Sequence, residues 1–167
     1  MSPSRWQGCA MALVTAALLG ACSSVPVEQR EAAARAQFQS YAGKPVDQFT
    51  WLGHYTSWQY LGQDPPDKPG GLGLYEIAIW TTPWDAYLLK IGHPCVDLPF
   101  AQGIGLTDTA RTVSSHFDFI LVRAMGGRRD LPWRCPIQEI RPVDYRRMRH
   151  DLKDAPKGQI KGEISGS

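Results

Sequence analysis

His116 and Asp118 are the two residues whose types and spacing come closest to a catalytic or metal-binding arrangement. At positions i and i+2 of a predicted strand, both side chains would lie on one face. A histidine beside a carboxylate can form a general-base pair or half of a metal site. No HxH, HExxH or GxSxG motif accompanies them, so a satisfied or exposed pair on a sheet edge is the preferred interpretation. A small enzyme or metal-binding protein stays open as the alternative, but no catalytic site, metal or cofactor is expected.

A second group of candidate residues is basic and lies near the C-terminus. Residues 123–153 contain nine basic and four acidic residues, although the whole chain has a net charge of only +2. A predicted terminal helix carries four of the basic residues: Arg146, Arg147, Arg149 and Lys153. Such a face could contact anionic lipid headgroups, an acidic polymer or a partner protein. A solvated helix face with weak local salt bridges is the simpler alternative.

Trp84 and Trp133 are the tryptophans expected nearest the surface. Trp84 lies in a predicted turn, and Trp133 lies in a basic loop. An exposed indole could belong to a binding surface for a sugar or a protein partner. Packing in the core or at its rim is preferred, because aromatic side chains bury a large area.

The first 21 residues have the pattern of a secretory signal peptide. Arg5 gives a positive start, and residues 9–21 form an almost wholly apolar run of 13 residues. A helix that spans a bilayer needs about 20 residues. The short run therefore indicates a cleaved signal rather than a transmembrane anchor.

The end of this run resembles the lipobox of bacterial lipoproteins through Leu19, Gly20, Ala21 and Cys22. The resemblance implies cleavage before Cys22 and acylation of its thiol, which would anchor the chain permanently in a membrane. The same resemblance implies that aspartate at the next position would favour retention in the inner membrane, so Ser23 there indicates the periplasmic face of the outer membrane. Expected partners are the membrane itself and an envelope protein, anionic lipid or polymer, but not nucleic acid. An ordinary cleavable signal with a coincidental cysteine is the alternative.

The four cysteines would then have three different fates. Cys9 leaves with the signal, and Cys22 is acylated. Cys95 and Cys135 remain in an oxidising compartment, where two thiols of a secreted domain usually form a disulfide. A redox pair lacks the CxxC spacing, and a zinc site lacks further ligands at suitable spacing. We therefore predict one disulfide between Cys95 and Cys135.

Length and composition set the domain organisation. With 167 residues, 43% of them hydrophobic and 20% charged, the chain suits one globular domain and excludes wholesale disorder. The small net charge gives no reason to expect nucleic-acid binding. We predict a signal peptide over residues 1–21, a lipidated tether over 22–27, a single domain over 28–155 and a disordered tail over 156–167.

The elements that must position these residues follow from hydrophobic periodicity and turn signals. Residues 28–41 are rich in helix formers and offer only Phe38 and Tyr41 as an apolar face, so we expect a lightly docked helix. Residues 142–155 predict a second, basic helix. Short strands are predicted over residues 49–52, 55–61, 74–81, 86–91, 104–107, 117–122 and 134–141.

No strand–helix–strand alternation occurs, so a parallel sheet is not expected. The predicted fold is α+β: an antiparallel, strongly curved sheet or partly open barrel of about six to seven short strands. A helix flanks it at each end of the domain, and one disulfide ties the segment after residues 86–91 to the last strand.

From about residue 38 to residue 150, the chain resembles a family of small bacterial lipoproteins known only as a domain of unknown function. The matching segments share their order along the chain: Gly43 to Val46, Trp51 and Trp58, Trp80 to Pro83, Ala86 to Leu89, Cys95 to Leu98 with Phe100 and Ala101, Ser114 to Asp118, and Cys135 to Asp144. The resemblance implies the two-cysteine α+β domain and supports the disulfide. It implies no activity, substrate or cofactor.

Overall fold

The computed structural model describes residues 25–65, 72–124 and 132–154. The predicted signal peptide, the predicted acylation site Cys22, the first half of the predicted tether and the predicted disordered tail lie outside the described residues. No helix within the described ranges is long and apolar enough to cross a membrane.

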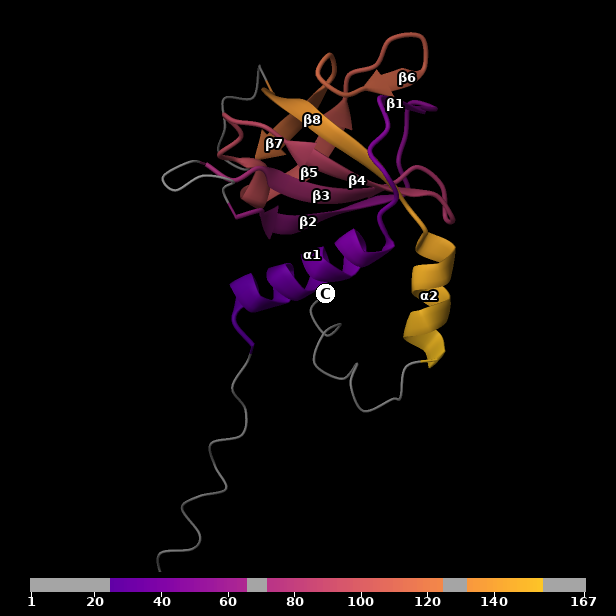
Figure 1. Cartoon of the computed structure of the whole chain (residues 1–167). Coiled ribbons are helices and arrows are strands. Elements are labelled where there is room, and N and C mark those ends of the chain that lie inside the picture. Colours follow the sequence, from indigo (N-terminus) through magenta and orange to yellow (C-terminus); the bar gives the residue numbers. More distant parts are fainter. Residues whose placement is uncertain (1–24, 66–71, 125–131, 155–167) are drawn as a thin grey trace, which may run out of the picture.

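The main sheet has six strands: β2 (Ser57–Gln63), β3 (Tyr75–Trp80), β4 (Ala86–Ile91), β5 (Ala101–Leu106), β7 (Phe119–Ala124) and β8 (Trp133–Val143). Their order is β2-β3-β4-β8-β7-β5, and every neighbouring pair is antiparallel. The sheet curls strongly into half a barrel (Figure 1). The predicted fold class, an α+β domain with an antiparallel and strongly curved sheet, is confirmed.

Two short strands form a second, smaller sheet. β1 (Gln48–Thr50) pairs antiparallel with β6 (Thr112–Ser114), and Phe49 lies opposite Val113. Both of these side chains are buried in the apolar cluster inside the half-barrel. Residues 49–52 were expected to form a strand in the main sheet, but only three residues pair, and they pair elsewhere.

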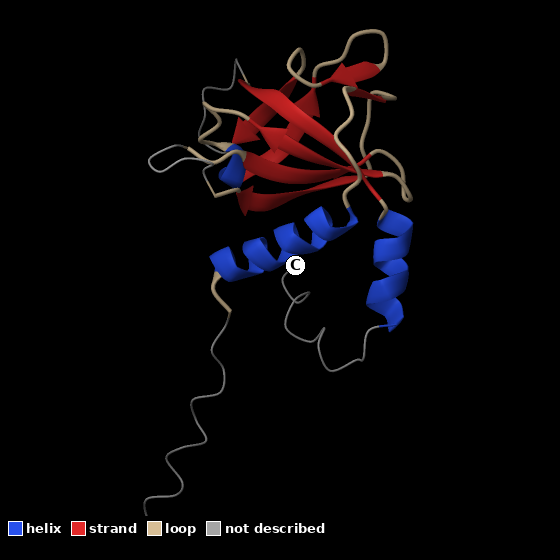
Figure 2. Ribbon diagram, in the orientation of Figure 1, coloured by secondary structure: helices blue, strands red, loops and turns tan. Residues whose placement is uncertain are grey.

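Both helices lie on the same side of the main sheet (Figure 2). α1 (Val27–Tyr41) begins after Pro26, and Glu28 in its first turn suits the positive end of the helix dipole. α2 (Tyr145–Asp154) begins after Asp144, whose Oδ1 accepts a hydrogen bond from the Arg147 amide at 3.1 Å. This cap places the helix start three residues later than predicted, because Pro142 and Val143 still pair with β4.

The sheet separates two apolar clusters. Alternate residues of β3 and β4 point inward, where Ile77, Ile79, Leu89 and Ile91 join the larger cluster inside the half-barrel. The residues between them face the helices, and the smaller cluster consists of Phe38, Leu61, Ala78, Ala86, Leu88, Val143 and Met148. Both faces of this part of the sheet are therefore covered.

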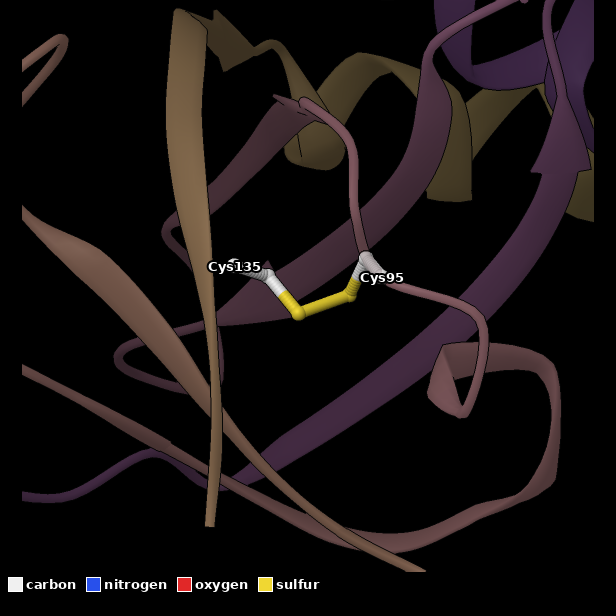
Figure 3. Close-up of a disulfide and its surroundings, with 2 residues drawn as sticks. All are labelled: Cys95 and Cys135. Carbon is white, nitrogen blue, oxygen red and sulfur yellow. A yellow bond between two sulfur atoms is a disulfide. The ribbon is translucent and has the colours of Figure 1, made fainter.

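Cys95 and Cys135 form the predicted disulfide (Figure 3). The bond joins the segment after β4 to β8 across 40 residues of sequence, and the two Cα atoms are 5.4 Å apart. Both cysteines are buried in the inner cluster. Between the first cysteine and β5 lies a short 3-10 helix, η2 (Leu98–Phe100), which buries Leu98 in the same cluster.

Candidate functional site

Trp84 projects from the tight turn between β3 and β4. The Thr82 hydroxyl oxygen accepts hydrogen bonds from the backbone amides of Trp84 and Asp85 at 3.2 and 3.0 Å. The same hydroxyl donates to Asp85 Oδ2 at 2.7 Å. The turn is therefore fixed by its own side chains, while the Trp84 indole remains 52% exposed. The expectation that Trp84 and Trp133, the latter 51% exposed, lie nearest the surface is confirmed, but Trp133 begins β8 rather than lying in a loop.

Two arginines of α2 lie against this indole. The guanidinium carbons of Arg146 and Arg149 are 5.9 and 5.3 Å from the centroid of the Trp84 ring, within cation–π range. Arg149 also lies 5.9 Å from the Tyr145 ring. We call Trp84, Arg146 and Arg149 the Trp84 face.

The helical period explains why these arginines, and not the other basic residues, meet Trp84. Arg146 and Arg149 are three residues apart and share one stripe of α2, and exposed Lys153 continues it by one turn. The stripe of Met148 and Leu152 packs toward the sheet. No salt bridge within the described ranges involves Arg146, Arg149 or Lys153.

Arg147 lies near α1 and is not part of the Trp84 face. Its Nε lies 3.8 Å from Asp151 Oδ2, and the Tyr41 hydroxyl donates to the same oxygen at 2.9 Å. Arg147 also lines an open cleft of about 450 Å³ between α1 and the end of β8, together with Ser40, Tyr41, Ala42, Gly43, Pro142, Val143 and Asp144. The structure therefore divides the four predicted basic residues between two surfaces.

His116 and Asp118 lie in the turn between β6 and β7, not on a strand. Asp118 is 6% exposed, and its carboxylate oxygens accept hydrogen bonds from the Thr107 hydroxyl and the Ser114 amide, both at 2.8 Å. His116 is exposed and has a positive φ of 68°. No hydrogen bond or ion pair joins the two side chains in the described structure, so Asp118 fastens the turn and His116 faces solvent.

The other histidines are separate from this turn. His93 bonds to the Gly73 carbonyl at 2.7 Å, and His150 lies 3.0 Å from the Asp154 carboxylate. Among the residues with described positions, no group of three or more His, Cys, Asp or Glu side chains could hold a metal ion. The geometry gives no support to a metal site built on His116 and Asp118.

A network of charged and polar side chains lies between α1 and the sheet. Glu76 of β3 is fully buried, and Gln39 of α1 donates to its two carboxylate oxygens at 3.1 and 3.0 Å. Lys90 Nζ is 3.9 Å from Glu76 Oε1 and 3.0 Å from Asp64 Oδ2. Arg35 donates to the Gln63 carbonyl at 2.8 Å. No local sequence pattern predicts this network, because its members come from four separate segments.

The network changes the proton affinity of its members. Burial raises the pKa of Glu76, although the hydrogen bond from Gln39 partly opposes this shift. Burial alone would lower the pKa of Lys90, but the hydrogen bond to Asp64 and the nearby carboxylates raise it overall. Each charge has an opposite partner, so the network attaches α1 to the sheet rather than presenting a reactive group.

Comparison with known protein families assigns the chain to one family. Residues 6–159 match the model of a family of unknown function, DUF6491. The chain belongs to this family. The DUF6491 match covers every described element, most of the predicted signal peptide and Cys22, but the family has no assigned activity. No curated protein matches the chain, and no solved structure does.

Proposed function

We propose that this DUF6491 protein is a lipid-anchored protein of the bacterial envelope that binds an anionic partner and catalyses no reaction. The observation that carries the proposal is the Trp84 face, where an exposed indole lies beside two arginines without an acidic partner in the described structure. Tryptophan and arginine are the residues most enriched at the centres of binding interfaces. The fixed turn reduces the entropy lost when Trp84 is immobilised by a partner.

The anchor is the second part of the proposal. Cleavage before Cys22 and acylation of its thiol would hold the chain at the membrane, and Ser23 directs it to the periplasmic face of the outer membrane. Three acyl chains at about 0.8 kcal/mol per buried methylene make this attachment permanent. An anchored protein needs only a weak additional contact, because the anchor raises the local concentration of a neighbouring partner.

In-cell photo-crosslinking tests the binding role. A photo-crosslinking amino acid at Lys153, which continues the stripe of Arg146 and Arg149, should give a specific adduct in envelope fractions. The same amino acid at Trp133, which is equally exposed but remote from α2, is the control. Adducts of equal yield at both positions, or none at Lys153, would contradict the proposal.

Fractionation of a Cys22→Ala variant tests the anchor separately. Membrane association should be lost, and the wild-type chain should label with radioactive palmitate. A variant that stays in the outer membrane fraction would show that the anchor lies elsewhere.

A further inference from the structure

We infer that the partner of the Trp84 face is a carboxylate-bearing glycan polymer of the cell envelope. The inference rests on the proposed function and names the chemical class of its anionic partner. Three observations carry it: the shape of the exposed indole, the placement of the guanidinium groups, and the position of the face relative to the anchor.

The Trp84 indole offers a flat apolar platform of the kind that a sugar ring can cover. Half of its surface is exposed, and the hydrogen bonds of Thr82 hold the turn that presents it. A sugar ring has an apolar face of C–H groups, which stacks on an aromatic plane and buries area on both sides. Because the turn is already ordered, little conformational entropy is lost on binding.

Arg146 and Arg149 provide the charge complementarity. Each guanidinium is a planar fork that can bind a carboxylate through two parallel hydrogen bonds. Both guanidinium groups lie over the ring, so a sugar stacked on the exposed part of the indole would bring its acidic substituents within their reach. Lys153 extends the basic stripe along the helix, which suits a polymer with repeated negative charges.

The position of the Trp84 face disfavours the lipid bilayer as its partner. The five residue steps from Cys22 to Val27 span at most about 17 Å. α1 then extends over 15 residues, or about 22 Å, and its far end contacts the start of α2 through the Asp144 amide and the Tyr41 carbonyl at 2.9 Å. The helix α2, which carries two residues of the face, therefore begins at the end of α1 that is remote from the tether (Figure 1).

The orientation of α2 also disfavours the lipid bilayer as the partner of the Trp84 face. A helix that lies in a membrane interface buries an apolar stripe among the acyl chains. In α2, the stripe of Met148 and Leu152 packs toward the sheet instead. The outward stripe is basic and has no apolar residue to insert, so we assign it to a polymer outside the bilayer.

Co-sedimentation with purified peptidoglycan sacculi, stripped of protein, tests the inference. The full acylated chain in nonionic detergent should sediment with sacculi, and high salt should release it. Trp84→Ala should weaken binding roughly 30-fold, as expected for a central aromatic residue. The double change Arg146→Glu with Arg149→Glu should abolish it.

Two matched variants control for exposure and charge. Trp133→Ala removes an equally exposed indole, and Arg134→Glu reverses an arginine that stacks on Phe119 at 4.7 Å instead. Both should bind sacculi like the wild type. Thermal unfolding of every variant confirms that the fold is retained.

The outcomes separate this inference from the proposed function. Absence of sedimentation with sacculi, or equal losses with Trp133→Ala, would overturn the glycan assignment. Slower amide exchange in α2 only when the chain is reconstituted with phosphatidylglycerol would identify the bilayer instead. A protein adduct at Lys153 without binding to sacculi would preserve the binding role and reject the glycan, whereas loss of both results would reject both proposals.

Discussion

Glu76 and Asp118 are two acidic side chains that this fold buries, and their surroundings give them different roles. Asp118 accepts two hydrogen bonds of 2.8 Å from neighbouring segments and so fixes a turn. Glu76 depends on Gln39 and on Lys90, whose ammonium nitrogen is 3.9 Å away. At the scale of the residue, Glu76 is therefore the group whose charge is more costly to maintain, because a buried charge needs close and complete pairing.

The change Glu76→Gln should alter how stability depends on pH. Burial raises the pKa of folded Glu76 above its ordinary value of 4.5, so the folded chain holds this proton more tightly than the unfolded chain. This stabilising contribution is fully present below about pH 4.5 and is lost as pH rises through the folded pKa. Urea unfolding should therefore show the variant gaining stability relative to the wild type between about pH 4 and pH 8.

Glu139→Gln is the control for this prediction. Glu139 lies opposite the same Lys90 in the sheet register, but it is only half-buried. This change removes one carboxylate beside Lys90 and leaves the buried Glu76 in place, so the Glu76→Gln series is compared with it at each pH. A Glu76→Gln variant whose stability difference is the same at both pH values would show that the buried carboxylate does not contribute this proton linkage.

At the scale of the elements, local sequence signals predicted some boundaries well and could not predict others. Helix formers placed α1 within one residue of its observed start. The alternation and turn of β3 and β4 predicted their hairpin. In contrast, β6 was missed and β1 was assigned to the wrong sheet, because three-residue strands have too little pattern to reveal a distant partner. Gly103 and Gly105 resemble turn residues, which hid the first half of β5.

The candidate site was predicted in pieces. The exposed position of Trp84 follows from its turn, and the basic character of α2 follows from composition. Their meeting depends on the Asp144 cap and on the direction in which α2 leaves β8, which no local pattern encodes. The prediction that α1 docks lightly is correct for its apolar contacts, because Phe38 is its only buried side chain. The prediction omitted the polar contacts that Arg35 and Gln39 add.

Gly62→Ala should loosen α1 more than a matched change elsewhere. Gly62 has a positive φ of 94°, and a Cβ there would lie 2.8 Å from Arg35 Nη1 and 3.3 Å from Glu31 Cβ. The added methyl must displace Arg35 from the Leu61 and Gln63 carbonyls, to which it now donates. Hydrogen exchange should show faster exchange of the α1 amides.

Gly53→Ala isolates the helix contact from the backbone strain. Gly53 also has a positive φ, of 82°, but a Cβ there meets nothing within 4 Å. Both variants should lose about 1–2 kcal/mol from the left-handed conformation. Gly62→Ala should lose about 1 kcal/mol more for the disturbed hydrogen bonds. Equal losses, with unchanged exchange in α1, would argue against a role for Gly62 in docking the helix.

At the scale of the whole molecule, one sheet connects two apolar clusters, and the disulfide belongs only to the inner one. The half-barrel encloses Cys95 and Cys135 among the residues of the larger cluster, while the helices cover the smaller cluster on the opposite face. Both clusters share β3, β4 and β8, so they should unfold in one cooperative transition. A change that destabilises the inner cluster should therefore also lower the stability of α1 and α2.

The double change Cys95→Ala with Cys135→Ala tests this connection. The disulfide restricts the unfolded chain by closing a loop of 40 residues, so its loss should lower the free energy of unfolding by about 2–5 kcal/mol. Urea unfolding followed both by Trp fluorescence and by far-ultraviolet circular dichroism should show one shifted transition. Dithiothreitol should destabilise the wild type to the same extent and leave the double variant unchanged. Separate transitions for the two signals would show that the helical face unfolds independently of the half-barrel.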